Sequence, residues 1–288
     1  MARPPDRVIT AVNERRAAIV DVIRGARESI VLSLFRCNDA DIFEALAAAT
    51  RRGVRVDALI TSRAKGGKKK LRKLWSALEA AGVQVQPYTE PVVKYHAKYL
   101  VADDGPAVIA SLNFTKKCFS RTCDAIVVTH DPAVVTGLRA LIAADRERAP
   151  LPDAVPARLI VGPERARRQF TELFERATTS IRLIDAKLTD PDLVTLLNAR
   201  RAAGVAVDVY TTKRLGALKS HGKIILIDDR TAVVGSLALA AISLGFRREV
   251  AIVIEDREAV ADVRTLFNTI EAQPTPGRIG ASEAGLTL

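Results

Sequence analysis

The sequence has few residues of the kinds that build disulfide frameworks, metal clusters or membrane spans. Of 288 residues, three are Cys and three are His, and Cys37, Cys118 and Cys123 are scattered along the chain. Three scattered Cys cannot form a disulfide framework, so we expect a reducing, cytoplasmic location. The N-terminal segment contains no apolar core of signal-peptide type. No uncharged apolar run reaches about 18 residues, so we expect no membrane-spanning segment.

Aromatic residues are also scarce, at 5% of the chain, and most lie in apolar runs. Few are therefore expected to stack on nucleic-acid bases. Acidic residues are outnumbered, since 44 Lys and Arg face 33 Asp and Glu, a net charge of +11. This surplus favours a polyanionic partner, nucleic acid or an anionic lipid surface, without choosing between them. An apolar fraction of 48% excludes a disordered chain, and the length suits one large domain or two modest ones.

The chain contains an internal repeat. Residues 30–61 align without a gap with residues 181–212. Each copy has an apolar run, then a helical pattern that we expect to be capped by Asn38 or Thr189, then a Gly and a β-branched run. The pattern predicts a strand, a helix and a second strand in each copy.

Amphipathic helices are predicted near 14–27 and 164–178, upstream of the two copies. A segment with three Pro lies between the halves and has the composition of a linker. We therefore divide the chain into an N-terminal lobe (1–148), a linker (149–157), a C-terminal lobe (158–272) and a flexible tail (273–288). Alternating strands and helices predict an α/β fold of two similar lobes.

A second shared block follows each copy of the repeat. Both blocks place a His, a Lys, an Asp, a Ser and a carboxylate at the same intervals: His96, Lys98, Asp103, Ser111 and Asp124, and His221, Lys223, Asp228, Ser236 and Glu249. Each block predicts a β-hairpin that turns at Asp-Asp. On a strand, His and Lys two residues apart face the same way. Lys supplies positive charge for phosphoryl oxygens, and His attacks phosphorus or donates a proton near neutral pH.

The doubled pattern, His-x-Lys followed by Asp and then Gly-Ser, resembles the signature of the phospholipase D superfamily, including phospholipase D and cardiolipin synthase-like enzymes. The second block matches in full, and the first has Ala110 where Gly is usual. The resemblance covers nearly the whole chain. It implies two α/β lobes, each a mixed sheet flanked by helices, related by a pseudo-two-fold axis with the active site between them.

The resemblance also implies roles for these residues. One His forms a covalent phosphohistidine and the other protonates the leaving oxygen; by analogy His96 is the nucleophile and His221 the general acid, although the spacing leaves the order open. Lys98, Lys223 and Asn113 would hold the phosphate oxygens. Six further residues have supporting roles: Asp124 and Glu249 as partners of the imidazoles, Ser111 and Ser236 as hydrogen-bond donors, and Asp103 and Asp228 as structural groups at the hairpin turns. No metal or cofactor is expected.

Two departures from the family pattern matter. The position two residues after Ser236, where the family has Asn, is occupied by Ala238. The second half therefore lacks one phosphate-facing amide. A weakly active module that binds polyanions is for this reason an alternative function. Between repeat and motif, the first half has 26 more residues than the second. These extra residues predict a helix at 70–81, on whose apolar stripe Trp75 lies as a core anchor.

The extra segment opens with a basic run that is either a solvated loop or an arm that grips substrate phosphates. Its proposed contact residues are Arg63, Lys65, Lys68, Lys69 and Lys70. Arg121, Arg247 and Arg248 precede the candidate carboxylates and either line the same mouth or pair with acids.

Three classes of function remain. Two motifs in one chain are similar to the lipid enzymes of the family and imply a monomer, so a metal-independent enzyme that hydrolyses or transfers phospholipid head groups leads, with peripheral membrane contact. The basic run favours the alternative, a metal-independent endonuclease of DNA or RNA. The binding module is the third.

Overall fold

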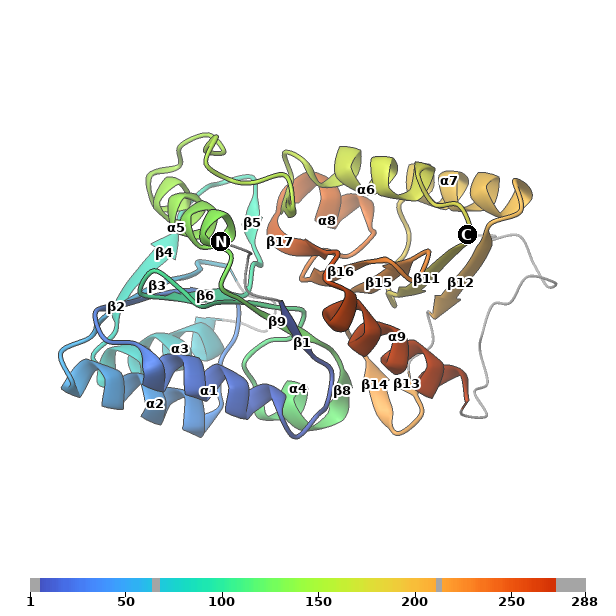
Figure 1. The fold of residues 1–288 in the computed structure, drawn as a ribbon. Helices are drawn as coiled ribbons and strands as arrows, with labels where there is room; N and C mark the ends of the chain where they lie inside the picture. The colour runs from blue at the N-terminus through green and yellow to red at the C-terminus, as the bar shows by residue number, and fades with distance from the viewer. Residues whose placement is uncertain (1–5, 64–67, 211–213, 273–288) are drawn as a thin grey trace.

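The computed structural model describes residues 6–63, 68–210 and 214–272, which form two α/β lobes lying side by side (Figure 1). The predicted two-lobed α/β fold is confirmed. The predicted tail at 273–288, and Lys65 of the proposed basic arm, lie outside the described residues.

The first lobe is built on a mixed sheet with strand order β1-β9-β7-β6-β2-β3-β4. Its strands are β1 (Arg7–Ile9), β2 (Ser29–Leu34), β3 (Arg55–Thr61), β4 (Gln84–Tyr88), β6 (Tyr99–Ala102), β7 (Ala107–Ala110) and β9 (Ile126–Thr129). Helices α1 (Arg15–Gly25), α2 (Ala40–Arg51) and α3 (Lys68–Ala80) cover one face, and α5 (Pro132–Glu147) covers the other (Figure 1). Strands β2, β3 and β4 run parallel because helices α2 and α3 connect them.

The second lobe repeats this plan with strand order β10-β17-β16-β15-β11-β12. Its strands are β10 (Leu159–Gly162), β11 (Ser180–Ile184), β12 (Ala206–Tyr210), β15 (Ile224–Ile227), β16 (Thr231–Gly235) and β17 (Arg247–Ile254). Helices α6 (Ala166–Glu175) and α7 (Pro191–Ala202) lie on one face, and α9 (Arg257–Glu271) lies on the other (Figure 1). Both repeats therefore form the predicted strand–helix–strand units.

Shorter elements lie where the lobes meet. They are β5 (Lys94–Tyr95), α4 (Lys116–Arg121), β8 (Thr122–Cys123), β13 (Arg214–Leu215), β14 (Leu218–Ser220) and α8 (Ala241–Phe246). Strand β5 joins β17 of the second sheet, whereas β13, β14 and β8 form a small sheet with strands from both lobes. The lobes thus exchange strands at their boundary.

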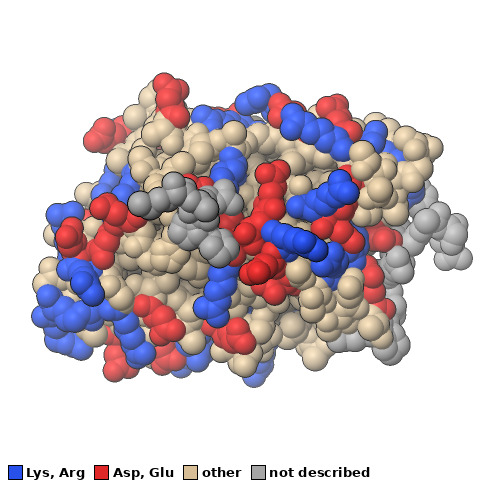
Figure 2. Space-filling model, viewed as in Figure 1, with Lys and Arg blue, Asp and Glu red and all other residues tan. Residues whose placement is uncertain are grey.

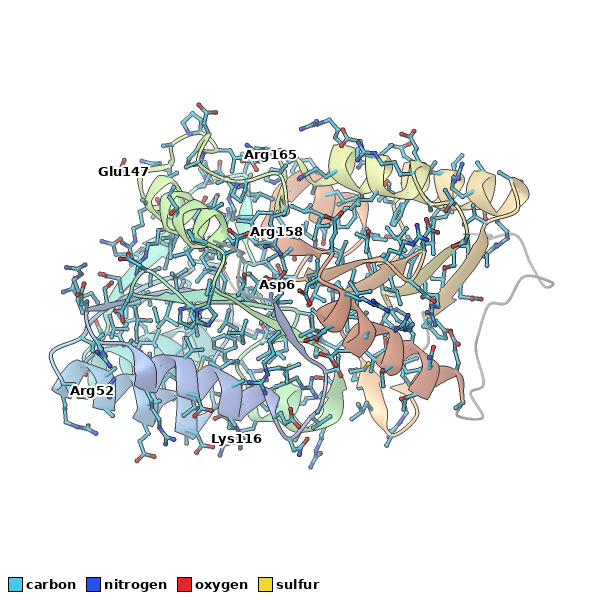
Figure 3. All side chains as sticks on the ribbon, in the orientation of Figure 1. Asp6, Arg52, Lys116, Glu147, Arg158 and Arg165 are labelled. Carbon is cyan, nitrogen blue, oxygen red and sulfur yellow. The ribbon has the colours of Figure 1, made fainter. Side chains whose placement is uncertain are left out.

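One continuous apolar cluster crosses the boundary, with Tyr99 and Leu138 from the first lobe and Leu226 and Phe267 from the second. Buried ion pairs cross it as well. Arg158 contacts Asp6 and also Asp131, whose carboxylate oxygen lies 2.6 Å from an Arg158 nitrogen. Figure 3 shows Asp6 and Arg158 close to each other between the lobes. Such shared burial holds the lobes in one fixed arrangement.

The predicted linker is packed against the lobes. Pro156 lies against Gly137 of α5, where an added Cβ would come within 2.5 Å of the proline ring. The Val155 carbonyl accepts a hydrogen bond of 2.8 Å from Arg165. The end of the linker therefore contacts both lobes.

Two local predictions needed correction. Helices α2 and α7 begin after Asp39 and Asp190, one residue beyond the expected caps at Asn38 and Thr189. At Asp190 the reason is visible, because its carboxylate accepts a hydrogen bond from the Leu193 amide at 3.2 Å.

Among the described residues, no helix is long and apolar enough to cross a membrane. The face shown in Figure 2 carries Lys and Arg side chains interspersed with Asp and Glu, so the positive surplus is not concentrated on that face.

Candidate active site

Each His-x-Lys pair lies in a three-residue break between two strands. His96 to Lys98 separate β5 from β6, and His221 to Lys223 separate β14 from β15. The prediction that these residues continue a strand is wrong. The chain changes sheets here, because β5 pairs with β17 of the second lobe whereas β6 pairs with β2 of the first.

The strand exchange between lobes brings the two motifs together. After the β5–β17 pairing, the His96 amide donates to the Arg248 carbonyl at 2.9 Å. After the β14–β8 pairing, the Gly222 amide donates to the Cys123 carbonyl at 2.7 Å. Each pairing aligns a His with the carboxylate residue that follows in the opposite lobe. The two exchanges are related by the repeat, as a pseudo-two-fold arrangement requires.

Each imidazole contacts the carboxylate of the other lobe. His96 Nδ1 hydrogen-bonds Glu249 Oε1, and His221 Nδ1 lies 3.1 Å from both carboxylate oxygens of Asp124. Both carboxylates are fully buried, whereas the side chains of His96 and His221 keep 18% and 31% of their surface exposed. Since Nδ1 is occupied in each ring, Nε2 is the nitrogen left for chemistry at the accessible side.

The two lysines lie beside their histidines. Lys98 Nζ is 3.1 Å from His96 Nδ1 and also donates to the His96 carbonyl. Lys223 Nζ donates to the His221 carbonyl in the same way. The contact agrees with the expected same-side placement of His and Lys, although the backbone is not a strand.

Burial and neighbouring cations set the protonation states on the His96 side. Burial, reinforced by Lys98 and Arg247, lowers the pKa of His96 well below its ordinary value. Burial also lowers the pKa of Lys98 to about 7 and raises the pKa of Glu249 to about 7. A neutral His96 that donates Nδ1–H to Glu249 keeps an unprotonated Nε2, the form a nucleophile needs.

Asp124 is held ionised by its neighbours. Burial alone raises its pKa, but the charge and hydrogen bond of His221 and the hydroxyls of Thr122 and Ser111 outweigh burial and lower it. Thr122 and Ser111 donate to the carboxylate at 2.6 and 2.7 Å. An anionic Asp124 accepts a hydrogen bond from His221 Nδ1 and so fixes the orientation of that imidazole.

The two Ser residues differ in their partners. Ser111 supports Asp124 directly, whereas Ser236 exchanges hydrogen bonds with the backbone of Val250 at 3.2 and 3.3 Å. Asn113 is buried, and its Oδ1 has no hydrogen-bond partner. Ala238 occupies the matching place in the second lobe and is also buried, so the asymmetry seen in the sequence is present in the fold.

Asp103 and Asp228 lie at the far ends of β6 and β15 from the histidines. Asp103 accepts amide hydrogen bonds from residues 27–29, and Asp228 accepts them from residues 178–180. The expected bonds to amides of their own turns are replaced by bonds to the start of β2 and β11. The reason is that each hairpin turn abuts the start of that adjacent strand.

The structure describes the two ends of the basic segment, Arg63 and the residues from Lys68 onward. Arg63 donates at 2.8 Å to the Glu90 carbonyl, in the loop that leads to β5. Lys68, Lys69 and Lys70 are exposed in the first turn of α3. Trp75 lies further along the same helix and is only partly buried. The helix thus begins slightly before the predicted residue 70, and Trp75 packs at the edge of the core.

A groove of about 640 Å³ runs beside α3. Its lining combines apolar side chains with lysines: Phe35, Phe43, Leu71, Leu74, Lys70, Lys73 and Lys117. Phe35 also packs on His96, with ring centroids 4.3 Å apart. Phe35 therefore lies between this groove and the first imidazole.

The three arginines that precede the carboxylates have separate places. Arg248 is buried and pairs with Asp145 at 2.7 Å and with Glu164 at 2.6 Å, so it joins the lobes. Arg247 lies 3.9 Å from Glu249 and belongs to the site. Arg121 is exposed.

Among the described residues, Cys118, Asp124 and His221 offer ligand atoms within 4.8 Å of one another, as a metal site would. The Asp124 oxygens already accept hydrogen bonds from Ser111 and Thr122 and contact His221. The carboxylate is thus satisfied by protein donors, and the set fits a hydrogen-bond network better than a zinc centre.

Sequence reasoning missed three residues of the site. Arg15 is fully buried in α1 and donates at 3.0 Å to the Thr122 carbonyl, which leads to Asp124. Phe35 packs on His96. Lys187, whose charge contributes to lowering the pKa of His96, aligns with Arg36 in the repeat, and that shared cation was the available signal. Nothing local to Arg15 indicates its long-range contact.

Fold and site together define a two-lobed α/β protein with a duplicated His-x-Lys centre. The family model described as "Cardiolipin synthase, PLD-like domain" matches residues 19–146 and 195–270, more than half of the chain. The chain therefore belongs to the phospholipase D superfamily, with the phosphodiesterase-type fold of that group. No curated protein sequence matches it.

Two solved structures share the fold over 94% of this chain. One is a polyphosphate kinase from Porphyromonas gingivalis, with a TM-score of 0.72 and 18% identity, of which 50% is covered. The chain thus spans half the length of that kinase. The other is a phosphatidylserine synthase from Haemophilus influenzae Rd KW20, with a TM-score of 0.67 and 14% identity, of which 87% is covered. At these identities the likeness concerns the fold alone.

Proposed function

We propose that this protein is a metal-independent phosphodiester hydrolase or transferase that works through a covalent phosphohistidine. The observation that carries the proposal is the crossed pairing of His96 with Glu249 and of His221 with Asp124. Two imidazoles, each oriented through Nδ1, supply the nucleophile and the general acid that a two-step displacement needs.

In the proposed first step, the Nε2 lone pair of His96 forms a bond to phosphorus and the phosphorus–oxygen bond to the leaving group breaks. His221 gives its proton to the departing oxygen. In the second step, His221 takes a proton from water or an acceptor alcohol, whose oxygen attacks phosphorus as the His96–phosphorus bond breaks. The lowered pKa of His96 and the anionic Asp124 beside His221 support this order of roles.

Cations around the imidazoles would hold the phosphate oxygens. Lys98, Lys223 and Asn113 take this role by resemblance to the family. In the second lobe, where Ala238 replaces the amide, Lys187 and Arg247 supply additional positive charge near His96. The site is then still cationic on both sides, which favours an active enzyme over a binding-only module.

The leading substrate class is phospholipid. The groove that continues from Phe35 offers apolar side chains with a rim of lysines, which suits a molecule that has both an apolar and an anionic part. The resemblance to the lipid enzymes of the family points the same way. Nuclease activity is the second candidate, favoured by the exposed Lys68, Lys69 and Lys70.

The test is turnover in excess chelator with two substrates, phospholipid vesicles and plasmid or single-stranded DNA. Bis-p-nitrophenyl phosphate serves as a generic soluble substrate. We expect head-group release that is lost in His96→Ala and His221→Ala, with a trapped phosphohistidine in one of these variants by mass spectrometry. Full activity of His221→Ala would refute the shared two-lobe site, and cleavage of DNA alone would select the nuclease.

A further inference from the structure

The most exposed large apolar side chains of the described residues are Val92, Ile242 and Phe246, with 63%, 59% and 55% of their surface accessible. Ile242 and Phe246 are four residues apart on α8, so they lie on one side of that helix. We call Val92, Ile242 and Phe246 the apolar lip. Exposed apolar side chains that gather in one place mark an interaction surface.

Strand pairing brings Val92 to α8. Lys94 of β5 lies opposite Arg247 of β17, and the two strands run parallel. Val92 is two residues before Lys94, and Phe246 is one residue before Arg247, so both enter the pairing from the same end. The strands then lead to His96 and Glu249. The apolar lip therefore stands at the entrance to the candidate active site.

The repeat shows that the apolar character of α8 is not shared by the equivalent helix of the first lobe. Ile242 and Phe246 of α8 align with Lys117 and Arg121 of α4, at the same offset that relates His221 to His96. Both helices directly precede a carboxylate strand, and they lie on opposite sides of the lobe boundary (Figure 1). The site thus has an apolar helix on one side and a basic helix on the other.

Cations flank the apolar lip itself. Lys94 of β5 and Arg247 of β17 are neighbours in the strand pairing at its base, and the Lys94 ammonium lies 5.7 Å from the centre of the Phe35 ring. The carboxylate of Glu90, in the same loop as Val92, is half-buried and accepts the Val93 amide, which turns its charge inward. Protruding apolar side chains with cations at their base, on the side of the candidate active site, match a surface that is anionic outside and apolar beneath.

We propose that the apolar lip docks the active site onto an anionic lipid bilayer, with Val92, Ile242 and Phe246 entering the interface and Lys94 and Arg247 at the head groups. The proposal goes beyond the proposed function, on which it rests for the use of lipid as substrate. It gives the site access to head groups in the membrane plane without a spanning segment.

Gly245 offers a sharp test within the lip. It is exposed between Ile242 and Phe246, and no atom lies within 4 Å of an added Cβ. Gly245→Asp places a negative charge on the lip without removing an apolar group, and Gly245→Ser is its matched neutral control. The double substitution Ile242→Ser with Phe246→Ser removes apolar surface instead.

The experiment is co-sedimentation with phosphatidylglycerol–phosphatidylcholine vesicles and with pure phosphatidylcholine vesicles, in the His96→Ala background so that turnover plays no part. We expect wild-type binding to the anionic vesicles, with partition reduced about tenfold or more by Gly245→Asp and by the double substitution, and little by Gly245→Ser. Unchanged binding in both test variants would overturn the proposal.

Two further measurements separate the alternatives. With His96 restored, turnover of the soluble substrate bis-p-nitrophenyl phosphate by the lip variants tests the proposed catalysis independently of membrane docking. If the wild-type protein does not turn over this substrate, the proposed function fails and the docking proposal is judged by the vesicle experiment alone. Light scattering after gel filtration reports a second copy of the chain as occupant. A wild-type dimer that the double substitution converts to monomer, without vesicle binding, would overturn membrane docking.

Discussion

His221 Nδ1, in the second lobe, lies 3.1 Å from both carboxylate oxygens of Asp124, in the first. The relationship makes the proposed general-acid function of His221 depend on the boundary between lobes. We expect Asp124→Asn to lower kcat by about 10²–10⁴, because the neutral amide no longer fixes the tautomer and orientation of His221 as the carboxylate does. Circular dichroism and thermal unfolding serve as folding controls. A kcat within twofold of wild type in a folded Asp124→Asn variant would remove the carboxylate from the mechanism.

The pKa of Lys98 predicts the alkaline limit of activity. Burial lowers this pKa to about 7, so the ammonium is charged below that pH and loses its charge as pH rises through about 7. We expect kcat/KM to fall across this range. Lys98→Arg keeps its charge at all accessible pH values and should move the alkaline limb upward, even at reduced overall rate. If the alkaline limb of the pH profile lies at the same pH in wild type and Lys98→Arg, the limb reports the titration of another group.

The sequence predicted the two-lobed fold because the relevant signals are local and repeated. Apolar runs, helix periodicity and the Asp-Asp turns lie within short stretches, and each occurs twice. Two independent copies make a chance pattern improbable. The same local signals predicted α3 from the spacing of Leu71, Leu74 and Leu78.

Long-range relationships were beyond those signals. The sequence does not specify that Asp124 serves His221 rather than His96, because that depends on the pairing of β14 with β8. The break at His96 arises from a change of sheets, which leaves no mark on side-chain alternation. The role of Arg248 as a buried link to Asp145 likewise depends on packing across the boundary.

Asp228 is expected to act in stability and not in turnover. Burial, the largest single cause, raises its pKa, but the amide hydrogen bonds from residues 178–180 together outweigh burial and lower the pKa below its ordinary value. Its stabilising effect is therefore present above about pH 3.9, the unfolded value, and is lost as pH falls further. Asp228→Ala should cost about 1–3 kcal/mol at pH 7.

Thermal unfolding at pH 7 and pH 3 measures this effect. The difference between wild type and Asp228→Ala should narrow at pH 3. Asp228→Asn is the matched control, since Asn tolerates the left-handed conformation of residue 228 (φ 52°) and keeps one acceptor oxygen. Loss of kcat at unchanged stability would instead place Asp228 in the catalytic machinery.

Lys187 is expected to compensate for Ala238. It is exposed at the surface, and its pKa is lowered by partial desolvation, the largest cause, and by the charges of Lys223 and Arg247. We expect Lys187→Met to reduce kcat/KM for bis-p-nitrophenyl phosphate by about tenfold or more, because one cation near the phosphate is lost. Lys116→Met, an exposed lysine on α4, is the control. Equal rates in the two variants would leave the second lobe without this compensation.

The basic segment at 63–73 contains seven cations and no acid, so it accounts for much of the net charge of +11. If Lys68, Lys69 and Lys70 contact an anionic substrate, their replacement by Gln should weaken binding and flatten the dependence of KM on salt, because fewer counterions are released. The matched control removes three exposed charges, those of Arg24, Arg27 and Arg51, which come before the starts of β2 and β3. The Arg27 amide donates to Asp103, at the far end of β6 from Lys98. Both triple variants change net charge equally. A flatter salt dependence in the lysine variant alone supports contact at the mouth of the site, whereas equal slopes in both would reduce the segment to a solvated surface.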